Sequence, residues 1–536
     1  MTQPSREPSR PPPTGRRGPR RRSLTQPAQR TRAADPARLV AYEVLRAVDD
    51  GAYTNLELPS RLRQARVTGR DAAFATELTY GATRMRGLYD PIIEVAAGRP
   101  LDALEPAVLD VLRLGAHQLL GMRVPAHAAC DSTVALARQT RGQGVAGLVN
   151  AALHRITERS RDEWLAEVAP ADATQEARLA TVTSHPAWIV RALRAALLGH
   201  GASVPETVDA DLRCLLDADN AAPRVTLALR PGLTDIDEVR TAGARPGALA
   251  PTAAVLAEGG DPGALAAVRQ GRAAVQDEAS QLVALALVAV DVAPARTPDA
   301  GSLDAAGTPD TGTPDTAGSL EATDGSGGDL VGERWLDLCA GPGGKAGLLA
   351  ALARQRGATL FANDVSEHRA QLVRQSVRAT AEAGADVYVG VGDGRELGVL
   401  EPASYDRVLV DAPCTGLGAL RRRPEARWRR AAQDLPGLTA LQGELLDSAL
   451  AAVRPGGVVL YATCSPHLAE TRYVVQDAVG RAQARGLGVQ MLDTAEAFRA
   501  VAVGELPDTG TAPYVQLWPH LHGTDGMFAA LLRRTA

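Results

Sequence analysis

Two cysteines in the last quarter of the chain have the surroundings expected of functional thiols. Cys414 lies in Val-Asp-Ala-Pro-Cys-Thr-Gly (410–416), and Cys464 lies in Tyr-Ala-Thr-Cys-Ser-Pro (461–466). Each follows a short apolar run that is typical of a buried parallel strand. Because ligands bind at the carboxyl ends of the strands in an open α/β sheet, we expect both thiols in one crevice. A lone cysteine would be interpreted as a small buried hydrophobe, but two at matching strand ends indicate a functional site.

A glycine-rich turn upstream of these cysteines has the form of a cofactor-binding loop. An apolar strand ends at Trp-Leu-Asp-Leu (335–338), and a helical stretch at 346–355 follows the turn at once. Glycines let the backbone approach a ligand closely, and a helix N-terminus offers free N–H groups. The candidate loop consists of Cys339, Ala340, Gly341, Pro342, Gly343, Gly344 and Lys345.

Three further predicted strands each end in an aspartate, namely Asp364, Asp393 and Asp411. Asp364 stands where a carboxylate commonly binds ribose hydroxyls. The Gly-x-x-x-x-Gly-Lys-Ser/Thr spacing of a phosphate-binding loop is absent. The pattern therefore favours a nucleoside-type cofactor that needs no phosphate cradle. No cysteine or histidine pair has the spacing of metal ligands, so no metal site is predicted.

Lys345 is the only lysine of the chain. The sequence holds 58 lysine and arginine residues, and every other one is arginine, as expected of GC-rich coding. A flexible ammonium differs from a rigid guanidinium in packing and hydration. A lysine kept at this place indicates a role that arginine cannot fill.

Together these residues resemble the RNA 5-methylcytosine methyltransferases that use S-adenosylmethionine, in particular the bacterial ribosomal branch of the RsmB/Sun type. The resemblance is carried by the loop 339–345, Asp364, Gly-Asp-Gly (392–394), Asp-Ala-Pro-Cys-Thr-Gly (411–416) and Thr-Cys-Ser (463–465). It implies that Cys339 to Lys345, with Asp364, Asp393 and Asp411, bind S-adenosylmethionine. It also implies that Cys464 is the nucleophile and that Cys414 is needed for product release. Gly341 stands where alanine is more usual, a change that we expect to be harmless.

The implied chemistry explains why two thiols are present. C5 of cytosine is a weak nucleophile, and a thiolate that adds to C6 makes the ring an enamine whose C5 can attack a methyl sulfonium. The C5 proton must then be removed and the enzyme's sulfur expelled, which is acid–base work. The residues alone do not decide which thiol attacks. DNA cytosine methyltransferases use the Pro-Cys thiol, which corresponds to Cys414, and only the RNA-family resemblance assigns the attack to Cys464.

The N-terminal third is expected to hold RNA-binding parts. Residues 1–35 are rich in proline and arginine, which predicts a disordered basic arm. Residues 36–165 show the apolar spacing of helices, most clearly at 37–49 and 107–120. The segment 70–84 is similar to the NusB-type domain, which implies an all-helical RNA-binding module.

The remaining chain predicts two further regions. Residues 166–272 are expected to form a linker and a small α+β region, which resembles the ferredoxin-like RNA-recognition fold of the family. Residues 273–536 are expected to form an α/β, Rossmann-like class I methyltransferase domain. A low-complexity acidic insert at 293–330 is expected to be disordered and to loop out of that domain.

A basic stretch follows the first cysteine motif. Residues 420–430 read Leu-Arg-Arg-Arg-Pro-Glu-Ala-Arg-Trp-Arg-Arg. Arginine contacts phosphates and stacks on bases, so we expect RNA contact here, against the alternative of a solvated helix face. The net formal charge of −4 hides this, because the acidic insert is strongly negative and the rest of the chain is mildly positive.

The predicted function is methyl transfer from S-adenosylmethionine to C5 of a cytosine in small-subunit (16S) ribosomal RNA, by a monomer. The alternatives are the same chemistry on transfer RNA, and a non-catalytic RNA-binding assembly or antitermination factor. Five scattered cysteines, no secretory h-region and no membrane-length apolar run predict a cytoplasmic protein with no membrane partner.

Overall fold

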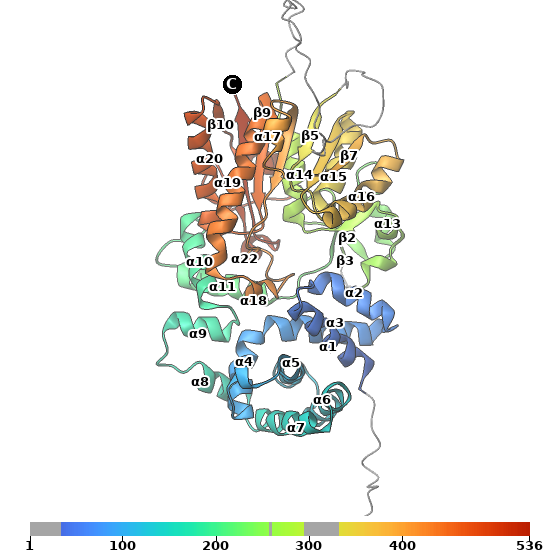
Figure 1. The fold of residues 1–536 in the computed structure, drawn as a ribbon, viewed down its shortest axis with the longest axis vertical. Coiled ribbons are helices and arrows are strands. Elements are labelled where there is room, and N and C mark those ends of the chain that lie inside the picture. The colour runs from blue at the N-terminus through green and yellow to red at the C-terminus, as the bar shows by residue number, and fades with distance from the viewer. Residues whose placement is uncertain (1–33, 257–259, 294–331) are drawn as a thin grey trace, which may run out of the picture.

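The computed structural model describes residues 34–256, 260–293 and 332–536 (Figure 1). The predicted basic arm (1–35) and acidic insert (293–330) therefore fall almost wholly outside the described residues. In Figure 1 an all-helical part lies below a part built on a large sheet, with α9, α10 and α11 along one side between them. Among the described helices, none is both long and apolar enough to cross a membrane.

The N-terminal domain is all-helical, as predicted. Its α1 begins at Pro36 because Asp35 accepts a hydrogen bond from the Arg38 N–H, and proline suits the first helical position. Buried leucine, isoleucine and valine side chains of α4, α5 and α7 form its main core. The helices are α1 (Pro36–Asp49), α2 (Thr54–Gln64), α3 (Gly69–Arg84), α4 (Arg86–Ala97), η2 (Leu101–Ala103), α5 (Pro106–Leu120), α6 (Ala126–Arg141) and α7 (Gln143–Thr157).

The next region begins with helices alone, and its strands start only at Thr226. These helices are α8 (Arg161–Val168), α9 (Gln175–Val182), α10 (Ala187–Gly199) and α11 (Val208–Asn220). A small antiparallel sheet of order β2-β3-β1-β4 follows, with one helix after β1 and another after β3. This is the split βαβ arrangement of ferredoxin-like folds, so the predicted small α+β fold is confirmed, while its last strand lies just beyond the predicted end at residue 272. Its elements are β1 (Thr226–Leu229), α12 (Ile236–Arg240), β2 (Ala244–Pro246), β3 (Ala253–Leu256), η3 (Pro262–Ala264), α13 (Ala266–Arg269) and β4 (Ala273–Val275).

The C-terminal domain is a doubly wound α/β sheet of order β10-β12-β9-β8-β5-β6-β7, with β11 paired to β12. Strands β5 to β9 are parallel, and β12 runs antiparallel to β9. The first half consists of α14 (Glu278–Ala289), β5 (Arg334–Asp337), α15 (Gly344–Arg356), β6 (Thr359–Asp364), α16 (Glu367–Glu382), β7 (Val387–Val391), α17 (Leu397–Leu400) and β8 (Tyr405–Asp411). The second half consists of α18 (Ala426–Arg429), η4 (Ala432–Asp434), α19 (Leu435–Ala452), β9 (Val453–Thr463), η5 (Leu468–Glu470), α20 (Arg472–Ala484), β10 (Val489–Met491), α21 (Thr494–Val501), β11 (Val515–Leu517), α22 (Pro519–His522) and β12 (Met527–Arg534).

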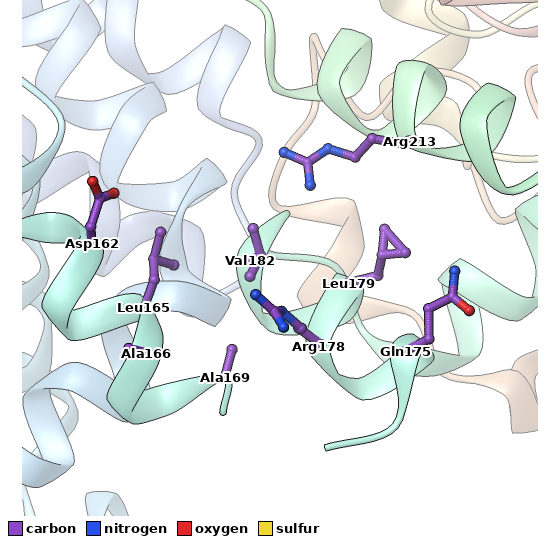
Figure 2. Close-up of a pocket in the computed structure, with 9 residues that line it drawn as sticks. All are labelled: Asp162, Leu165, Ala166, Ala169, Gln175, Arg178, Leu179, Val182 and Arg213. Carbon is purple, nitrogen blue, oxygen red and sulfur yellow. The ribbon is translucent and has the colours of Figure 1, made fainter. Parts of the chain in front are cut away.

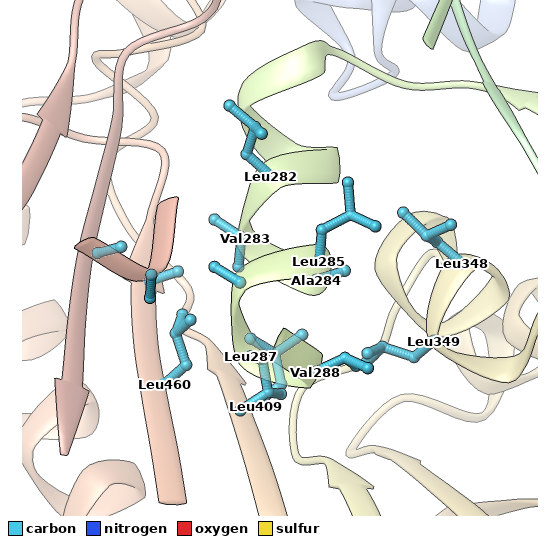
Figure 3. Packing of buried hydrophobic residues seen from close by; sticks show 14 of the residues in the cluster. Leu282, Val283, Ala284, Leu285, Leu287, Val288, Leu348, Leu349, Leu409 and Leu460 are labelled. Carbon is cyan, nitrogen blue, oxygen red and sulfur yellow. The ribbon is translucent and has the colours of Figure 1, made fainter. Parts of the chain in front are cut away.

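Helix α14 connects the small sheet to the large one. It is apolar on nearly every side, as expected of a helix that is covered all round. Figure 3 shows its leucines and valines between Leu348 and Leu349 of α15 and the strand residues Leu409 and Leu460. This packing fixes α15, and therefore the glycine-rich loop that precedes it, against the sheet.

Candidate functional site

All the predicted site residues follow the carboxyl ends of neighbouring parallel strands. From one side of the sheet to the other, these strands are β9 with Cys464, β8 with Asp411 and Cys414, β5 with the glycine-rich loop, β6 with Asp364 and β7 with Asp393. The chain changes direction between β5 and β8, which lie side by side although they are far apart in sequence. Such a switch point is where open α/β sheets bind ligands.

The two thiols lie together. The Sγ atoms of Cys414 and Cys464 are 3.4 Å apart, and both residues are half-buried. The hydrogen bond between the two sulfurs, in which either thiol can be the donor, lowers the pKa of the Cys464 thiol despite burial. The same hydrogen bond, together with burial, raises the pKa of Cys414. The pair therefore favours one thiolate beside one thiol, with the pKa of Cys464 shifted down and that of Cys414 shifted up.

Lys345 extends from the first turn of α15 to the end of β8. Its Nζ lies 2.7 Å from Oδ2 of Asp411 and 3.3 Å from Oγ of Ser280 on α14. Burial alone would lower the pKa of Lys345, but the Asp411 carboxylate outweighs burial and raises the pKa. A narrow, buried ammonium fits between these two oxygens, which gives a physical reason for lysine here.

The glycines of the loop are required by close contacts. Gly343 has φ +106° at the start of α15, and a Cβ there would lie 2.7 Å from the Cβ of Ser376. The Gly341 N–H donates to Oδ2 of Asp364 at 3.0 Å, and a Cβ on Gly341 would lie 2.4 Å from that oxygen. An alanine at position 341 would therefore require the Asp364 side chain to move.

The other loop residues and the outer acids have distinct surroundings. Burial raises the pKa of the Cys339 thiol, so this cysteine stays protonated, while Pro342 is exposed. Asp364 also pairs with Arg369, at 3.0 Å. The Asp393 carboxylate pairs with Arg395 at 2.5 Å and lies two strands away from the glycine-rich loop. The structure thus gathers the thiols and Lys345 with Asp411, and places Asp393 at the edge of the site.

Asp337 is a candidate that the sequence analysis missed. It ends β5, is 1% exposed, and neither carboxylate oxygen makes a hydrogen bond of standard geometry within the described residues. Burial, followed by the nearby Asp411 charge, raises its pKa to about 8. An acid inside the apolar strand 335–338 was the signal that could have identified it, because a buried carboxyl without a partner points to a ligand.

The basic stretch 420–430 contacts protein, which makes the prediction of RNA contact wrong for its buried arginines. Arg427 is 0% exposed and donates to main-chain oxygens of Arg84, Ser184 and Asp219. Arg421 is also buried and is held by carboxylates of the catalytic domain. Arg423 remains exposed. The stretch therefore joins the helical domain, the central helices and the catalytic domain.

An open cavity lies between α8, α9 and α11 (Figure 2). Leu165 and Leu179 line its apolar part, and Arg178 and Arg213 line its rim. None of the lining residues is a predicted site residue, so this cavity is separate from the thiol pair.

Comparison with known proteins gives the family. Residues 330–533 match the model described as 16S rRNA methyltransferase RsmB/F, and residues 35–158 match the NusB family. A protein of Mycobacterium tuberculosis that is named as a methyltransferase is 48% identical over 97% of this chain and 98% of its own length. The ribosomal RNA small subunit methyltransferase B of Pseudomonas putida is 31% identical over 83% of this chain and 89% of its own length.

Among solved structures, the crystal structure of PH0851 has the same fold, with a TM-score of 0.70 and 20% sequence identity over 94% of this chain and 99% of that chain. Two domain models match in the predicted order along the chain, and the long alignments to full-length relatives leave no large part uncovered. The chain belongs to the RsmB/F family of 16S rRNA methyltransferases, with a NusB-type domain at its N-terminal side.

Proposed function

We propose that this protein methylates C5 of a cytosine in small-subunit ribosomal RNA through a covalent bond between Cys464 and C6 of the base. The observation that carries the proposal is the hydrogen-bonded thiol pair at the ends of β8 and β9. Addition to C6 needs one thiolate, and release of the product needs a second group that handles protons. A pair in which one sulfur ionises and its neighbour keeps a proton meets both needs.

The residues of the β5 and β6 edge fit S-adenosylmethionine, a nucleoside that bears a sulfonium cation. Asp337 is a buried carboxyl with no side-chain hydrogen bond among the described residues, and Asp364 and Asp411 lie near enough to act on its pKa. The loop 339–345, Asp364, Asp393 and Asp411 would hold the donor, with Asp364 at the ribose. When bound, the donor supplies the methyl group that C5 of the activated ring takes up.

The chain's own residues then have separate tasks. The Cys464 sulfur forms the bond to C6, and the π electron pair of the C5–C6 double bond shifts onto C5, which can then attack the methyl group. Cys414 serves the later step, in which the C5 proton leaves and the bond from sulfur to C6 breaks. Lys345 holds the Asp411 carboxylate in place beside the thiols. The protein acts as a monomer in this proposal.

Bisulfite sequencing tests the substrate and the atom together. Deleting the gene from its host should remove protection from one cytosine in small-subunit ribosomal RNA. Wild-type protein should restore that protection, while Cys464→Ala and Cys414→Ala should not. Loss confined to transfer RNA would keep the chemistry and replace the substrate. No change in any RNA would favour a non-catalytic binding factor.

The raised pKa of Asp337 predicts a pH dependence of donor binding. Below pH 8 the Asp337 carboxyl is protonated and neutral, so it attracts the cationic donor weakly. The Kd for S-adenosylmethionine should therefore fall as the pH rises from about 6 to 8, by up to tenfold per unit, and then level off. Isothermal titration calorimetry measures it.

Asp337→Asn is the matched control, because asparagine has the same shape and no charge to lose. The donor's own amino group titrates near pH 8 in both proteins, so the difference between the two Kd profiles isolates Asp337. Identical pH profiles for the two proteins would remove Asp337 from the donor site.

A further inference from the structure

Glu470 is a fully buried glutamate that no ion pair of the described residues accounts for. It ends η5, six residues after Cys464, and its side chain is 0% exposed. Within the described part of the chain it forms no ion pair. A buried carboxylate is costly unless donors surround it, and Glu470 has such donors.

Four hydrogen bonds converge on the Glu470 carboxylate. Oε1 accepts from the backbone N–H of Thr415 at 2.7 Å and from Nε2 of Gln442 at 3.2 Å. Oε2 accepts from the hydroxyls of Thr415 at 2.5 Å and Ser465 at 2.6 Å. The two hydroxyls also lie 3.1 Å from each other. The carboxylate therefore clamps Thr415 and Ser465 together.

The clamped residues are the immediate neighbours of the two thiols. Thr415 follows Cys414 in the loop after β8, and Ser465 follows Cys464 in the loop after β9. These two loops belong to different strands, so a contact between them is needed to hold the sulfurs at 3.4 Å. Glu470 provides such a contact through groups one residue away from each sulfur, in addition to the hydrogen bond that the Gly418 N–H donates to the Cys464 main-chain oxygen.

The charge of Glu470 also lies on the Cys414 side of the pair. The hydrogen bond with Cys464 and burial raise the pKa of Cys414 most, and the charges of Cys464 and Glu470 raise it further. A negative charge beside a thiol favours the protonated form.

The surroundings of Cys464 are different. The hydrogen bond with Cys414 lowers the pKa of Cys464 most, burial and the Asp411 carboxylate oppose that effect, and Arg423 and Lys345 assist it. The remaining titratable groups that face this cluster are Tyr461, whose hydroxyl donates to the Glu470 main-chain oxygen, and His467, whose ring caps η5. The two cations thus favour ionisation at Cys464, and the Asp411 carboxylate opposes it.

We propose that Glu470 is the positioning residue of the thiol pair, and that its carboxylate holds the two cysteine loops together and keeps the shared proton on Cys414. Cys464 is then the sulfur free to attack. That Cys464 attacks a cytosine rests on the proposed function above. The contact between the loops and the position of the proton do not depend on it. Within the described residues the Glu470 carboxylate bonds Thr415, Gln442 and Ser465, so it acts on the thiols through their neighbours.

Glu470→Gln separates charge from shape. The glutamine Oε1 can still accept from the Thr415 N–H and Gln442, and its amide can donate to the two hydroxyls, which rotate to accept. The variant therefore keeps the clamp and loses one negative charge. We expect the alkaline limb of the kcat profile, where Cys414 loses its proton, to move down by about one pH unit. KM for RNA and for the donor should change less than about twofold.

Alkylation reads the proton's position without any methyl transfer. Iodoacetamide reacts with thiolates, so in the wild type at pH 8 we expect Cys464 to be labelled about tenfold more than Cys414, as measured by peptide mass spectrometry. In Glu470→Gln the ratio should fall, because the negative charge that favours the protonated form of Cys414 is gone. An unchanged ratio and an unchanged alkaline limb would overturn the electrostatic role of Glu470.

Thr415→Val is the complementary variant, because it removes one clamp hydroxyl and keeps the carboxylate. We expect kcat to fall about tenfold with the alkaline limb unmoved, and Thr415→Ser to restore the rate. Wild-type kcat in Thr415→Val would overturn the positioning role. Thermal unfolding and donor binding of each variant show whether it is folded.

The product nucleoside of the wild type is identified in the same samples. A wild type that makes no 5-methylcytosine would refute the proposed function while the alkylation ratios still decide on Glu470. If the wild type makes 5-methylcytosine and the Glu470 and Thr415 variants match it in rate and alkylation, only the role of Glu470 is refuted.

Discussion

Replacing Cys464 with alanine will abolish methyl transfer, and replacing Cys414 with alanine will leave the protein covalently joined to its RNA. Without the Cys464 sulfur no adduct with C6 can form, so C5 stays a weak nucleophile. Loss of a nucleophile commonly costs about 10⁴-fold or more in kcat. Without Cys414 the adduct forms, but the step that removes the C5 proton and breaks the bond from sulfur to C6 fails.

Two measurements separate these outcomes. Transfer of a radioactive methyl group to small-subunit RNA from the deletion strain gives kcat, and a denaturing gel reveals protein that stays attached to RNA. The attached species should appear with Cys414→Ala and disappear in the double variant that also lacks Cys464. Cys214→Ala is the matched control, because Cys214 is an exposed free thiol on α11 and should behave as wild type.

The opposite pattern has a definite meaning. If Cys414→Ala abolished transfer and Cys464→Ala trapped RNA, the order of the thiols would be that of the DNA enzymes. We expect otherwise, since the cations Lys345 and Arg423 favour a thiolate at Cys464 against the opposing Asp411 carboxylate, and Glu470 disfavours one at Cys414. The trapped species therefore also tests the electrostatics of the crevice.

The edge of the catalytic sheet could be predicted from sequence because its signals are local. Each parallel strand is a short apolar run, and the polar residue after the run marks its carboxyl end. Asp364 and Asp411 each stand at the last position of a strand, as predicted. Once strands are known to be parallel, their ends must lie on one edge, so the gathering of the thiols followed from the pattern.

Groups that act through distant partners could not be predicted in this way. Glu470 is one carboxylate among 62 acidic residues, and nothing beside it in the sequence shows that Thr415 and Gln442 will surround it. The prediction of RNA contact for the basic stretch 420–430 was wrong for the same reason. A run of arginines has the same composition whether its partners are phosphates or main-chain carbonyls, and only the fold decides between them.

Replacing Arg427 with methionine will destabilise the junction between the domains. Its guanidinium bonds the main-chain oxygens of Arg84, Ser184 and Asp219 and the side chain of Asn220, at 2.8–3.1 Å. Burial lowers its pKa to about 9, so at pH 7 it is still charged. Methionine keeps the apolar stem but leaves these acceptors without a donor, at a cost of about 3–5 kcal/mol.

The measurements for Arg427→Met are thermal unfolding and limited proteolysis between α9 and α10, where we expect a lower midpoint and faster cleavage. Arg430→Met is the control, because Arg430 is only half-buried and its side chain forms no hydrogen bond or ion pair within the described residues. The pair of variants also decides between the two interpretations of the basic stretch. Replacing an arginine that contacts RNA would raise KM for RNA and leave stability unchanged. Replacing Arg427 at a domain junction must lower stability first. RNA binding then weakens only because the helical domain is no longer held against the catalytic domain.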